Sequence, residues 1–121
     1  MKDWHAIMIN LDTSIYDTIA IIDQGSMQIA FVTDAEGHLL GAVSDGDVRR
    51  AILRNIPMSA PVCQIMKSEP VSAGQHATRE HLRAIMDRME IRQIPIVDDS
   101  NRILRIESWL DTLQPSRKSN P

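Results

Sequence analysis

Apolar residues recur with helical spacing near the start of the chain and are followed by two short apolar runs. Ile15, Ile19 and Ile22 fall at positions i, i+4 and i+7, which is the spacing of one helix face. A serine or threonine precedes this stretch as a candidate N-cap, and Gly25 is a candidate end. The pattern therefore predicts an amphipathic helix.

The two apolar runs that follow predict a β-hairpin. Residues 28–33 and 39–43 are rich in β-formers, and the polar turn Asp34-Ala35-Glu36-Gly37 separates them. A further helix is predicted from about Asp45 to Asn55, with two carboxylates in its first turn.

The second half of the chain repeats this order. Residues 14–47 align with residues 78–111 without a gap. The repeated elements are a helix with the apolar stripe Leu82, Ile85, Met86 and Met89, strands at 93–97 and 103–106, and a last helix from about Trp109 to Leu113. Two prolines mark the segment between the repeats as a connector, with one helical turn predicted at residues 62–66.

These elements predict an α+β fold of tandem repeats, each a small β-sheet with two helices. Because each half is too small to bury much apolar surface alone, we expect the two to pack as a pseudo-twofold pair. The expected division is a first unit with its connector at residues 1–66, a second unit at 67–114, and a polar, disordered tail at 115–121.

Composition excludes several classes of protein. The chain has 121 residues, 43% of them apolar, and a net charge of −3. That acidic balance argues against a nucleic-acid-binding surface. No apolar run is long enough to span a membrane, and one cysteine, Cys63, excludes an internal disulfide. The composition is typical of a cytoplasmic protein, and the four histidines form no metal-ligand pattern.

A duplicated Ser-x-x-Asp spacing is the most informative motif. Ser44 and Asp47 begin one predicted helix, and Ser108 and Asp111 begin its counterpart. A hydroxyl and a carboxylate so placed can hold a sugar diol, and arginines beside a helix N-terminus can hold phosphate. The alternative is structural, since serine is a favoured N-cap and acidic residues are favourable in a first helical turn.

Together these marks resemble a pair of cystathionine-β-synthase (CBS) domains, often called a Bateman module. The resemblance rests on the repeat, on Ser44-Asp45-Gly46-Asp47-Val48-Arg49-Arg50, and on Ile91-Arg92-Gln93-Ile94-Pro95-Ile96-Val97-Asp98. More narrowly, the chain resembles the N-terminal regulatory region of bacterial sugar-phosphate nucleotidyltransferases, in which a C-terminal transferase domain follows.

The resemblance implies an adenosine ligand, AMP, ADP or ATP, in a crevice between the two units. Asp47 would accept the ribose hydroxyls, and Ser44 would meet a phosphate at the helix N-terminus. Arg49 or Arg50 would neutralise phosphate charge, but not both, because they point about 100° apart on a helix. The other residues expected at this first site are Asp45, Gln28, Ile29 and Ala30, the last three as walls of the base.

A second, weaker site is implied in the other repeat. Its expected residues are Ser108, Asp111, Arg92, Gln93, Val71, Ser72 and Ala73. Glu107 would repel a phosphate there, Arg105 stands where Gly41 stood, and no arginine follows Asp111. The first site is therefore expected to be the better one.

The sequence thus predicts a regulatory adenine-nucleotide-binding module that requires no cofactor and holds no metal. It is not expected to be an enzyme by itself, because no nucleophile–base pair, metal cluster or phosphate loop is present. The alternative is a structural module without ligand that forms a homodimer through its helices. The stripes Ile15/Ile19/Ile22 and Leu82/Met86/Met89 would then supply the dimer face.

Overall fold

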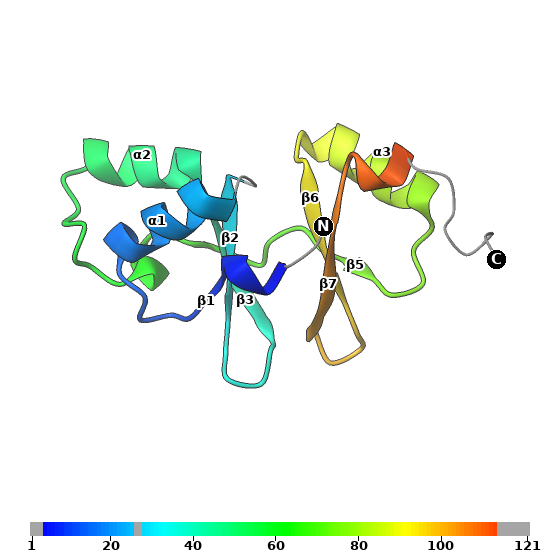
Figure 1. The fold of residues 1–121 in the computed structure, drawn as a ribbon, viewed down its shortest axis with the longest axis horizontal. Coiled ribbons are helices and arrows are strands. Elements are labelled where there is room, and N and C mark those ends of the chain that lie inside the picture. The colour runs from blue at the N-terminus through cyan, green and yellow to red at the C-terminus, as the bar shows by residue number, and fades with distance from the viewer. Residues whose placement is uncertain (1–3, 26–27, 114–121) are drawn as a thin grey trace. The chain divides into compact units, whose positions relative to one another are not determined.

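The computed structural model describes residues 4–25 and 28–113, which form two compact units. The N-terminal unit ends at Pro70 and the C-terminal unit begins at Val71. Each is a small sheet with helices beside it (Figure 1). The expectation of an α+β fold of tandem repeats is confirmed.

The N-terminal unit contains a four-stranded sheet in the order β1-β2-β3-β4. Strands β1 and β2 are parallel, and the remaining pairs are antiparallel. The elements are η1 (Trp4–Ile7), β1 (Met8–Ile9), α1 (Ile15–Gly25), β2 (Ile29–Thr33), β3 (Leu39–Ser44), α2 (Asp45–Leu53), η2 (Val62–Gln64) and β4 (Lys67–Ser68).

The C-terminal unit contains a three-stranded sheet in the order β5-β6-β7. Strands β5 and β6 are parallel, and β6 and β7 form an antiparallel hairpin. The elements are β5 (Ala73–Gly74), α3 (Arg79–Met89), β6 (Gln93–Val97), β7 (Ile103–Ser108) and η3 (Asp111–Leu113).

The two units repeat one another in detail. Ile29 pairs with Ser44 in the first hairpin, and Gln93 pairs with Ser108 in the second. Both hairpins also shift register at the same place, between Val32 and Thr33 and between Ile96 and Val97. Equivalent residues therefore occupy equivalent positions in both halves.

Each unit has its own aliphatic core. In the N-terminal unit Ile15 and Ile22 of α1 pack with Val32 and Val43 of the hairpin. In the C-terminal unit Leu82 and Met86 of α3 belong to the same buried cluster as the hairpin residues, which are Ile94 and Ile96.

Burial corrects the predicted dimer face, because most of both stripes lies inside the units. Ile15, Ile22, Leu82 and Met86 are buried, so they hold each unit together. Met89, by contrast, is 47% exposed at the end of α3, where Glu90 turns into the left-handed region and stops the helix.

The prediction of a second helix in the C-terminal repeat was wrong. Instead of a helix from Trp109, the described residues form one 3₁₀ turn, η3. The backbone N–H of Trp109 donates to the carbonyl of Arg92 at 2.8 Å, which extends the strand pairing past Ser108. The indole Nε1–H donates to Asp87 at 2.9 Å and fixes Trp109 outside the turn.

Other element ends moved by a few residues. Helix α2 ends at Leu53 rather than Asn55, the connector forms a 3₁₀ turn over Val62–Gln64, and β7 continues beyond residue 106 to Ser108. Residue 28 precedes β2 with a positive φ of 62°. The tail predicted to be disordered lies outside the described residues. No helix among the described residues is long and apolar enough to cross a membrane.

Candidate functional site

Ser44 and Asp47 form a reciprocal cap at the start of α2. The Ser44 hydroxyl accepts from the backbone N–H of Asp47 at 3.3 Å. The Asp47 Oδ2 atom accepts from the Ser44 backbone N–H at 2.9 Å and from its hydroxyl at 3.1 Å. This capping box explains why a helix begins here, and it confirms the structural interpretation of the motif.

Arg50 adds a contact that capping does not require. Its Nη2 atom donates to Asp47 Oδ1 at 2.8 Å. The Asp47 side chain is only 7% exposed, while that of Arg50 is 55% exposed. A nearly buried carboxylate and an accessible guanidinium therefore meet at the N-terminus of α2, where backbone N–H groups also favour negative charge.

Gly46 makes room for that arginine. A Cβ atom at residue 46 would lie 3.3 Å from Nη1 of Arg50 and 3.4 Å from its Nη2, which is tighter than most side-chain contacts. The guanidinium thus folds back across the first turn of α2 onto bare backbone. The sequence analysis had quoted this glycine but had given it no role.

Arg49 lies elsewhere on the helix, as the 100° rotation predicts. Its side chain lines a mostly apolar groove of about 260 Å³ between α1 and α2. The groove is lined by Ile19, Ile22, Asp45, Val48, Arg49 and Ile52. Asp45 is also exposed, so neither Asp45 nor Arg49 contacts the Asp47 carboxylate in any hydrogen bond described here.

The three residues expected to wall the base differ in accessibility. Gln28 is exposed, and its carbonyl accepts from the backbone N–H of Asp45, which ties the start of the hairpin to α2. Ile29 is half-buried. Ala30 is fully buried in the core, so its side chain has no surface left for a ligand.

Ser108 and Asp111 repeat the reciprocal cap in the C-terminal unit. The Ser108 backbone N–H donates to Asp111 Oδ2 at 3.1 Å, and the Asp111 N–H donates to the Ser108 hydroxyl at 3.2 Å. Partial burial acts to raise the pKa of Asp111, but several lowering interactions, the hydrogen bonds from Ser108 first among them, together hold that pKa below its ordinary value. The carboxylate is therefore ionised at neutral pH.

The Arg92 guanidinium lies over the ring of Trp109. The guanidinium carbon lies 5.9 Å from the centre of the indole ring, within cation–π range. Both residues line a pocket of about 310 Å³ with Met86, Asp87, Glu90 and Ile91. Gln93 follows as the first residue of β6 and is half-buried. The sequence analysis missed Trp109, although its place directly after Ser108 was a signal.

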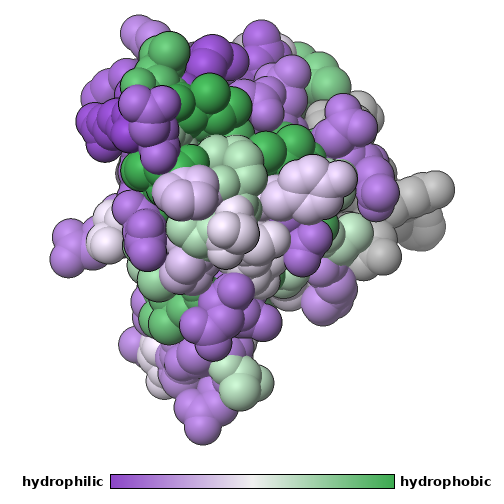
Figure 2. All heavy atoms as spheres, turned by 90° about the vertical axis from the view of Figure 1, so that its left-hand side faces the viewer, coloured by the Kyte–Doolittle hydropathy of each residue, from purple (hydrophilic) through white to green (hydrophobic). Residues whose placement is uncertain are grey.

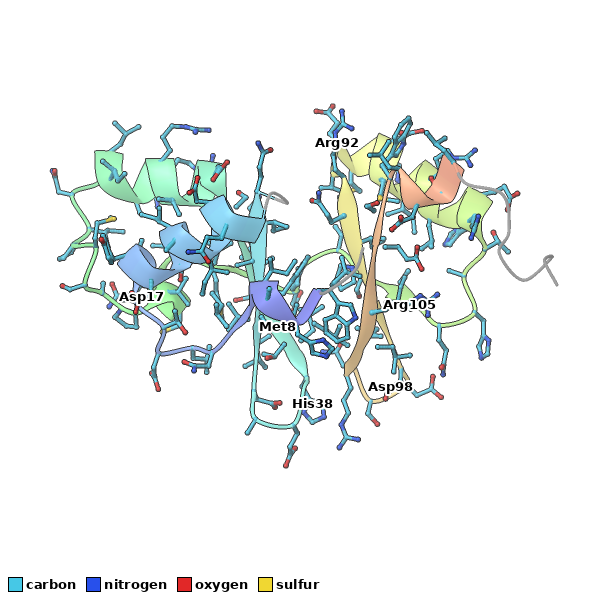
Figure 3. The ribbon with its side chains drawn as sticks, viewed as in Figure 1. Met8, Asp17, His38, Arg92, Asp98 and Arg105 are labelled. Atoms are coloured by element: carbon cyan, nitrogen blue, oxygen red, sulfur yellow. The ribbon has the colours of Figure 1, made fainter. Side chains whose placement is uncertain are left out.

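Glu107 is neutralised by its neighbour, which removes one objection to the second site. Arg105 Nε donates to Glu107 Oε2 at 2.7 Å along β7. Residues two apart on a strand share a face, so the pair lies on one side of the sheet. Figure 3 shows Arg105 on β7 and Arg92 at the start of β6, near the opposite end of the hairpin from Asp98.

The remaining residues expected at the second site are Val71, Ser72 and Ala73, which lie at the start of the C-terminal unit, next to and within β5. Val71 and Ser72 are half-buried, and Val71 packs against the core. Ala73 is buried within the core and pairs with Ile96 through β5.

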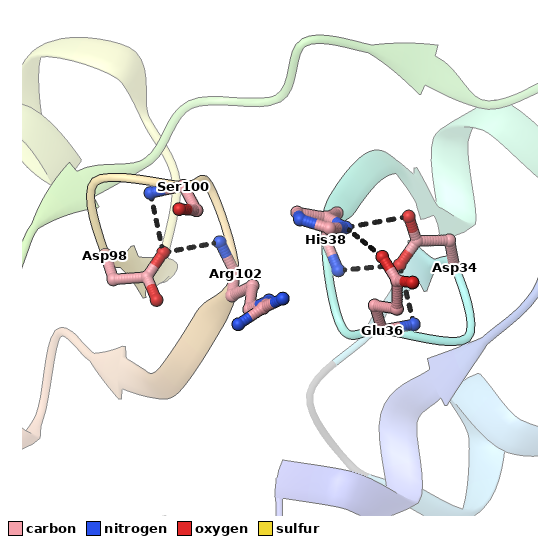
Figure 4. A network of polar contacts seen from close by, with 6 residues as sticks. All are labelled: Asp34, Glu36, His38, Asp98, Ser100 and Arg102. Atoms are coloured by element: carbon pink, nitrogen blue, oxygen red, sulfur yellow. Dashed lines mark hydrogen bonds and ion pairs between the residues drawn. The ribbon is translucent and has the colours of Figure 1, made fainter.

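The two hairpin turns are closed by equivalent aspartates (Figure 4). Asp34 Oδ1 accepts from the N–H groups of Glu36 and His38, both at 2.9 Å. Asp98 Oδ1 does the same for Ser100 and Arg102, also at 2.9 Å.

One turn brings together a group that the sequence analysis did not foresee. Potential ligand atoms of Asp34, Glu36 and His38 all lie within 4.8 Å of one another, so the expectation that no histidine joins such a group was wrong. His38 Nδ1 lies 2.8 Å from Asp34 Oδ2. The same turn forms around Asp98 without a histidine. Turn closure therefore explains Asp34 but does not by itself make the group a metal site.

Comparison with known proteins places the chain in a family. A family model described as CBS domain matches residues 1–54 and 62–106. The uncharacterised protein RP505 of Rickettsia prowazekii is 34% identical over 89 residues, which cover 74% of this chain and 28% of that protein. KpsF of Escherichia coli, an arabinose 5-phosphate isomerase, is 27% identical over 96 residues, which cover 78% and 29%. The matches thus span less than a third of these relatives' lengths.

Solved structures share the fold. The CBS domain pair of protein MJ0100, in complex with 5′-methylthioadenosine and S-adenosyl-L-methionine, has a TM-score of 0.75 at 23% identity, covering 87% of this chain and 86% of that one. CBSX2 in complex with AMP has a TM-score of 0.77 at 18% identity, covering 93% and 85%. Since the matched segments cover both repeats, the chain belongs to the CBS domain family and carries the domain in tandem.

Proposed function

We propose that the chain is a non-catalytic regulatory module that binds an adenine nucleotide, AMP, ADP or ATP. The observation that carries this proposal is the pair of Asp47 and Arg50, 2.8 Å apart at the N-terminus of α2. A carboxylate suits the ribose diol, and a guanidinium beside a helix N-terminus suits phosphate. The adenosine ligands of the solved relatives support the choice of nucleotide.

The roles within the first site follow from the contacts of each group. Asp47 accepts the ribose hydroxyls, while the Ser44 hydroxyl and Arg50 meet the phosphate. Gln28 and Ile29 lie beside the base. Arg49 is less suited, because it faces the groove between α1 and α2.

The second site is proposed as the weaker one. Ser108 and Asp111 offer the same hydroxyl and carboxylate, and Arg92 and Gln93 would face the phosphate. Gln114 stands three residues after Asp111, at the place where Arg50 follows Asp47, and Arg92 already contacts Trp109. Nucleotide should therefore fill the Asp47 site first.

Thermal unfolding with added AMP, ADP or ATP tests the proposal. A ligand at about 100 times its Kd stabilises the folded state by about 2.7 kcal/mol, which raises the melting temperature. Asp47→Asn should abolish the rise, whereas Asp17→Asn, a first-turn carboxylate of α1, should leave it intact. No rise with any of the three nucleotides at millimolar concentration would refute the proposal.

The enzyme that the module regulates is a separate proposal. The sequence resemblance favours a sugar-phosphate nucleotidyltransferase, whereas curated relatives include arabinose 5-phosphate isomerases. We propose a sugar-phosphate enzyme in the cytoplasm, where nucleotide is available. Assays of the full-length protein for nucleotidyl transfer and for isomerisation, each with and without AMP, distinguish the two activities and test regulation.

Dimerisation through helices is the alternative function, and one observation favours it. Ile52 and Leu53 at the end of α2 are 53% and 77% exposed, and Tyr16 on α1 is 68% exposed. Figure 2 looks onto the side where these helices lie and shows apolar surface among hydrophilic side chains near the level of α2. If a second copy covers this surface, Leu53→Asp should halve the mass measured by light scattering.

A further inference from the structure

The Asp47 carboxylate is already occupied by donors from its own chain. Oδ2 accepts two hydrogen bonds, from the backbone N–H and the hydroxyl of Ser44, and Oδ1 accepts one from Arg50. A carboxylate has about four acceptor positions in all. One position is therefore open on Oδ1, while Oδ2 is saturated.

A ribose diol needs more than that one position. Its two hydroxyl groups each donate a hydrogen bond, so binding both requires that at least one present donor leave Asp47. The backbone N–H of Ser44 cannot leave without opening the start of α2. The Ser44 O–H can turn away about its Cβ–Oγ bond while Oγ still accepts from the Asp47 N–H. The Arg50 side chain, which is more than half exposed, can rotate off Oδ1.

We propose that nucleotide binding drives an exchange of partners at Asp47. The ribose diol takes the positions vacated by Arg50 and by the Ser44 hydroxyl, and both of those donors move to the phosphate. This inference rests on the proposed function and adds a reason why binding of the ribose and binding of the phosphate should depend on one another. The same two groups that block the ribose position in the empty module are those that the phosphate attracts.

The geometry around Gly46 supports a swing of Arg50 rather than of the helix. The guanidinium lies across Gly46, which has no side chain to confine it on that side. The reciprocal bonds between the backbone N–H groups and the side chains of Ser44 and Asp47 remain in place during the swing. The cap can thus persist while the arginine changes its partner.

The exchange predicts a specific dependence on the phosphate. In the proposed exchange adenosine displaces Arg50 from Asp47 without offering it another anion, so part of the binding free energy of adenosine is lost. AMP offers that anion. AMP should therefore bind more tightly than adenosine, and the difference should depend on residue 50.

Isothermal titration of adenosine and AMP into the wild type, Arg50→Gln and Arg54→Gln tests this exchange. Arg54, the C-cap of α2, is the control. In the wild type and in Arg54→Gln, AMP should bind at least roughly tenfold more tightly than adenosine, about 1.4 kcal/mol. In Arg50→Gln the AMP advantage should largely disappear, while adenosine binds as tightly as in the wild type or more tightly. Gly46→Ala, which crowds the guanidinium, should also strengthen adenosine binding.

Different results overturn different claims. If Arg50→Gln weakens adenosine and AMP by the same factor, or leaves their ratio at the wild-type value, the exchange is wrong although nucleotide still binds. If neither ligand produces heat with the wild-type protein, the proposed function fails and the exchange fails with it.

Discussion

The sulfur of Met66 lies where a side chain at residue 41 would begin. A Cβ atom at Gly41 would be 2.6 Å from that sulfur and 2.9 Å from the carbonyl oxygen of Lys67. The glycine permits β4 to pair with β3, in which Gly41 lies opposite Ser68. The equivalent residue in the second repeat is Arg105. It lies on β7, an outer strand of the described C-terminal sheet, and charged side chains are favoured on such strands.

Substitution Gly41→Ala should therefore destabilise the N-terminal unit. The methyl group meets backbone as well as a flexible side chain, and overpacking of this kind costs about 1–3 kcal/mol. Urea unfolding measures the loss. Gly74→Ala is the control, because a Cβ there would meet nothing within 4 Å. Equal stability of the two variants would show that β4 does not hold Gly41 closely.

Substitutions at Ser44 separate its structural role from its binding role. Replacing an N-cap serine by alanine costs about 0.5–2 kcal/mol, but replacing it by glycine costs only a few tenths. Ser44→Ala should thus lose stability and AMP affinity, whereas Ser44→Gly should lose mainly affinity. Denaturant unfolding and calorimetry measure the two effects.

Thr78→Ala is the matched control for that pair, since Thr78 caps α3 through the N–H of His81. It should lower stability without lowering AMP affinity. If AMP affinity instead follows stability across all three variants, the Ser44 hydroxyl only caps the helix.

Stability should fall in acid partly through Asp34. Hydrogen bonds from the His38 backbone, chief among several contacts, hold the Asp34 pKa below its ordinary value. A carboxyl whose folded pKa is depressed contributes stability above its unfolded pKa, about 3.9, and loses it as the pH falls through the folded pKa. Melting temperatures between about pH 6 and pH 2 should therefore fall less steeply for Asp34→Asn than for the wild type.

The control for this pH dependence is Asp99→Asn, an exposed aspartate of the other turn. Its melting curve should follow the wild type across the acid range. The same slope for wild type and Asp34→Asn would contradict the assignment.

Arg83 should hold η3 against α3. Its Nε and Nη2 atoms donate to the hydroxyl and the carbonyl of Thr112, which is buried. Arg83→Met leaves that carbonyl with one donor fewer, which costs about 1–3 kcal/mol when the group is buried. Urea unfolding should detect the loss, and Arg88→Met, at an exposed position of α3, should cause a smaller one. Equal losses would mean that the Thr112 contacts contribute little.

Local periodicity predicted most of the fold. The helix stripes, the polar turns at Asp34 and Asp98, and the repeat all lie within short stretches of sequence. Strands β1, β4 and β5 were not foreseen, because two-residue strands form through pairing with distant residues and carry no pattern of their own. Trp109 broke the predicted helix through contacts with Asp87 and Arg92, which sequence spacing does not reveal.

The candidate site was predicted less completely. The cap formed by Ser44 and Asp47 could be predicted because their spacing is that of an N-cap, while their role in binding a ligand stays a prediction. The contact of Arg50 with Asp47 was not predicted, although helical spacing makes residues three apart neighbours. That Ala30 and Ala73 are buried could not be read from single residues, because burial depends on which strand covers each face.

A crystal structure of the chain with AMP would show directly whether Asp47 holds the ribose. Both ribose hydroxyl groups should lie within hydrogen-bond distance, about 3 Å, of the Asp47 carboxylate, with Arg50 turned onto the phosphate. AMP bound with its ribose away from Asp47, or no AMP in crystals grown at millimolar nucleotide, would contradict this prediction.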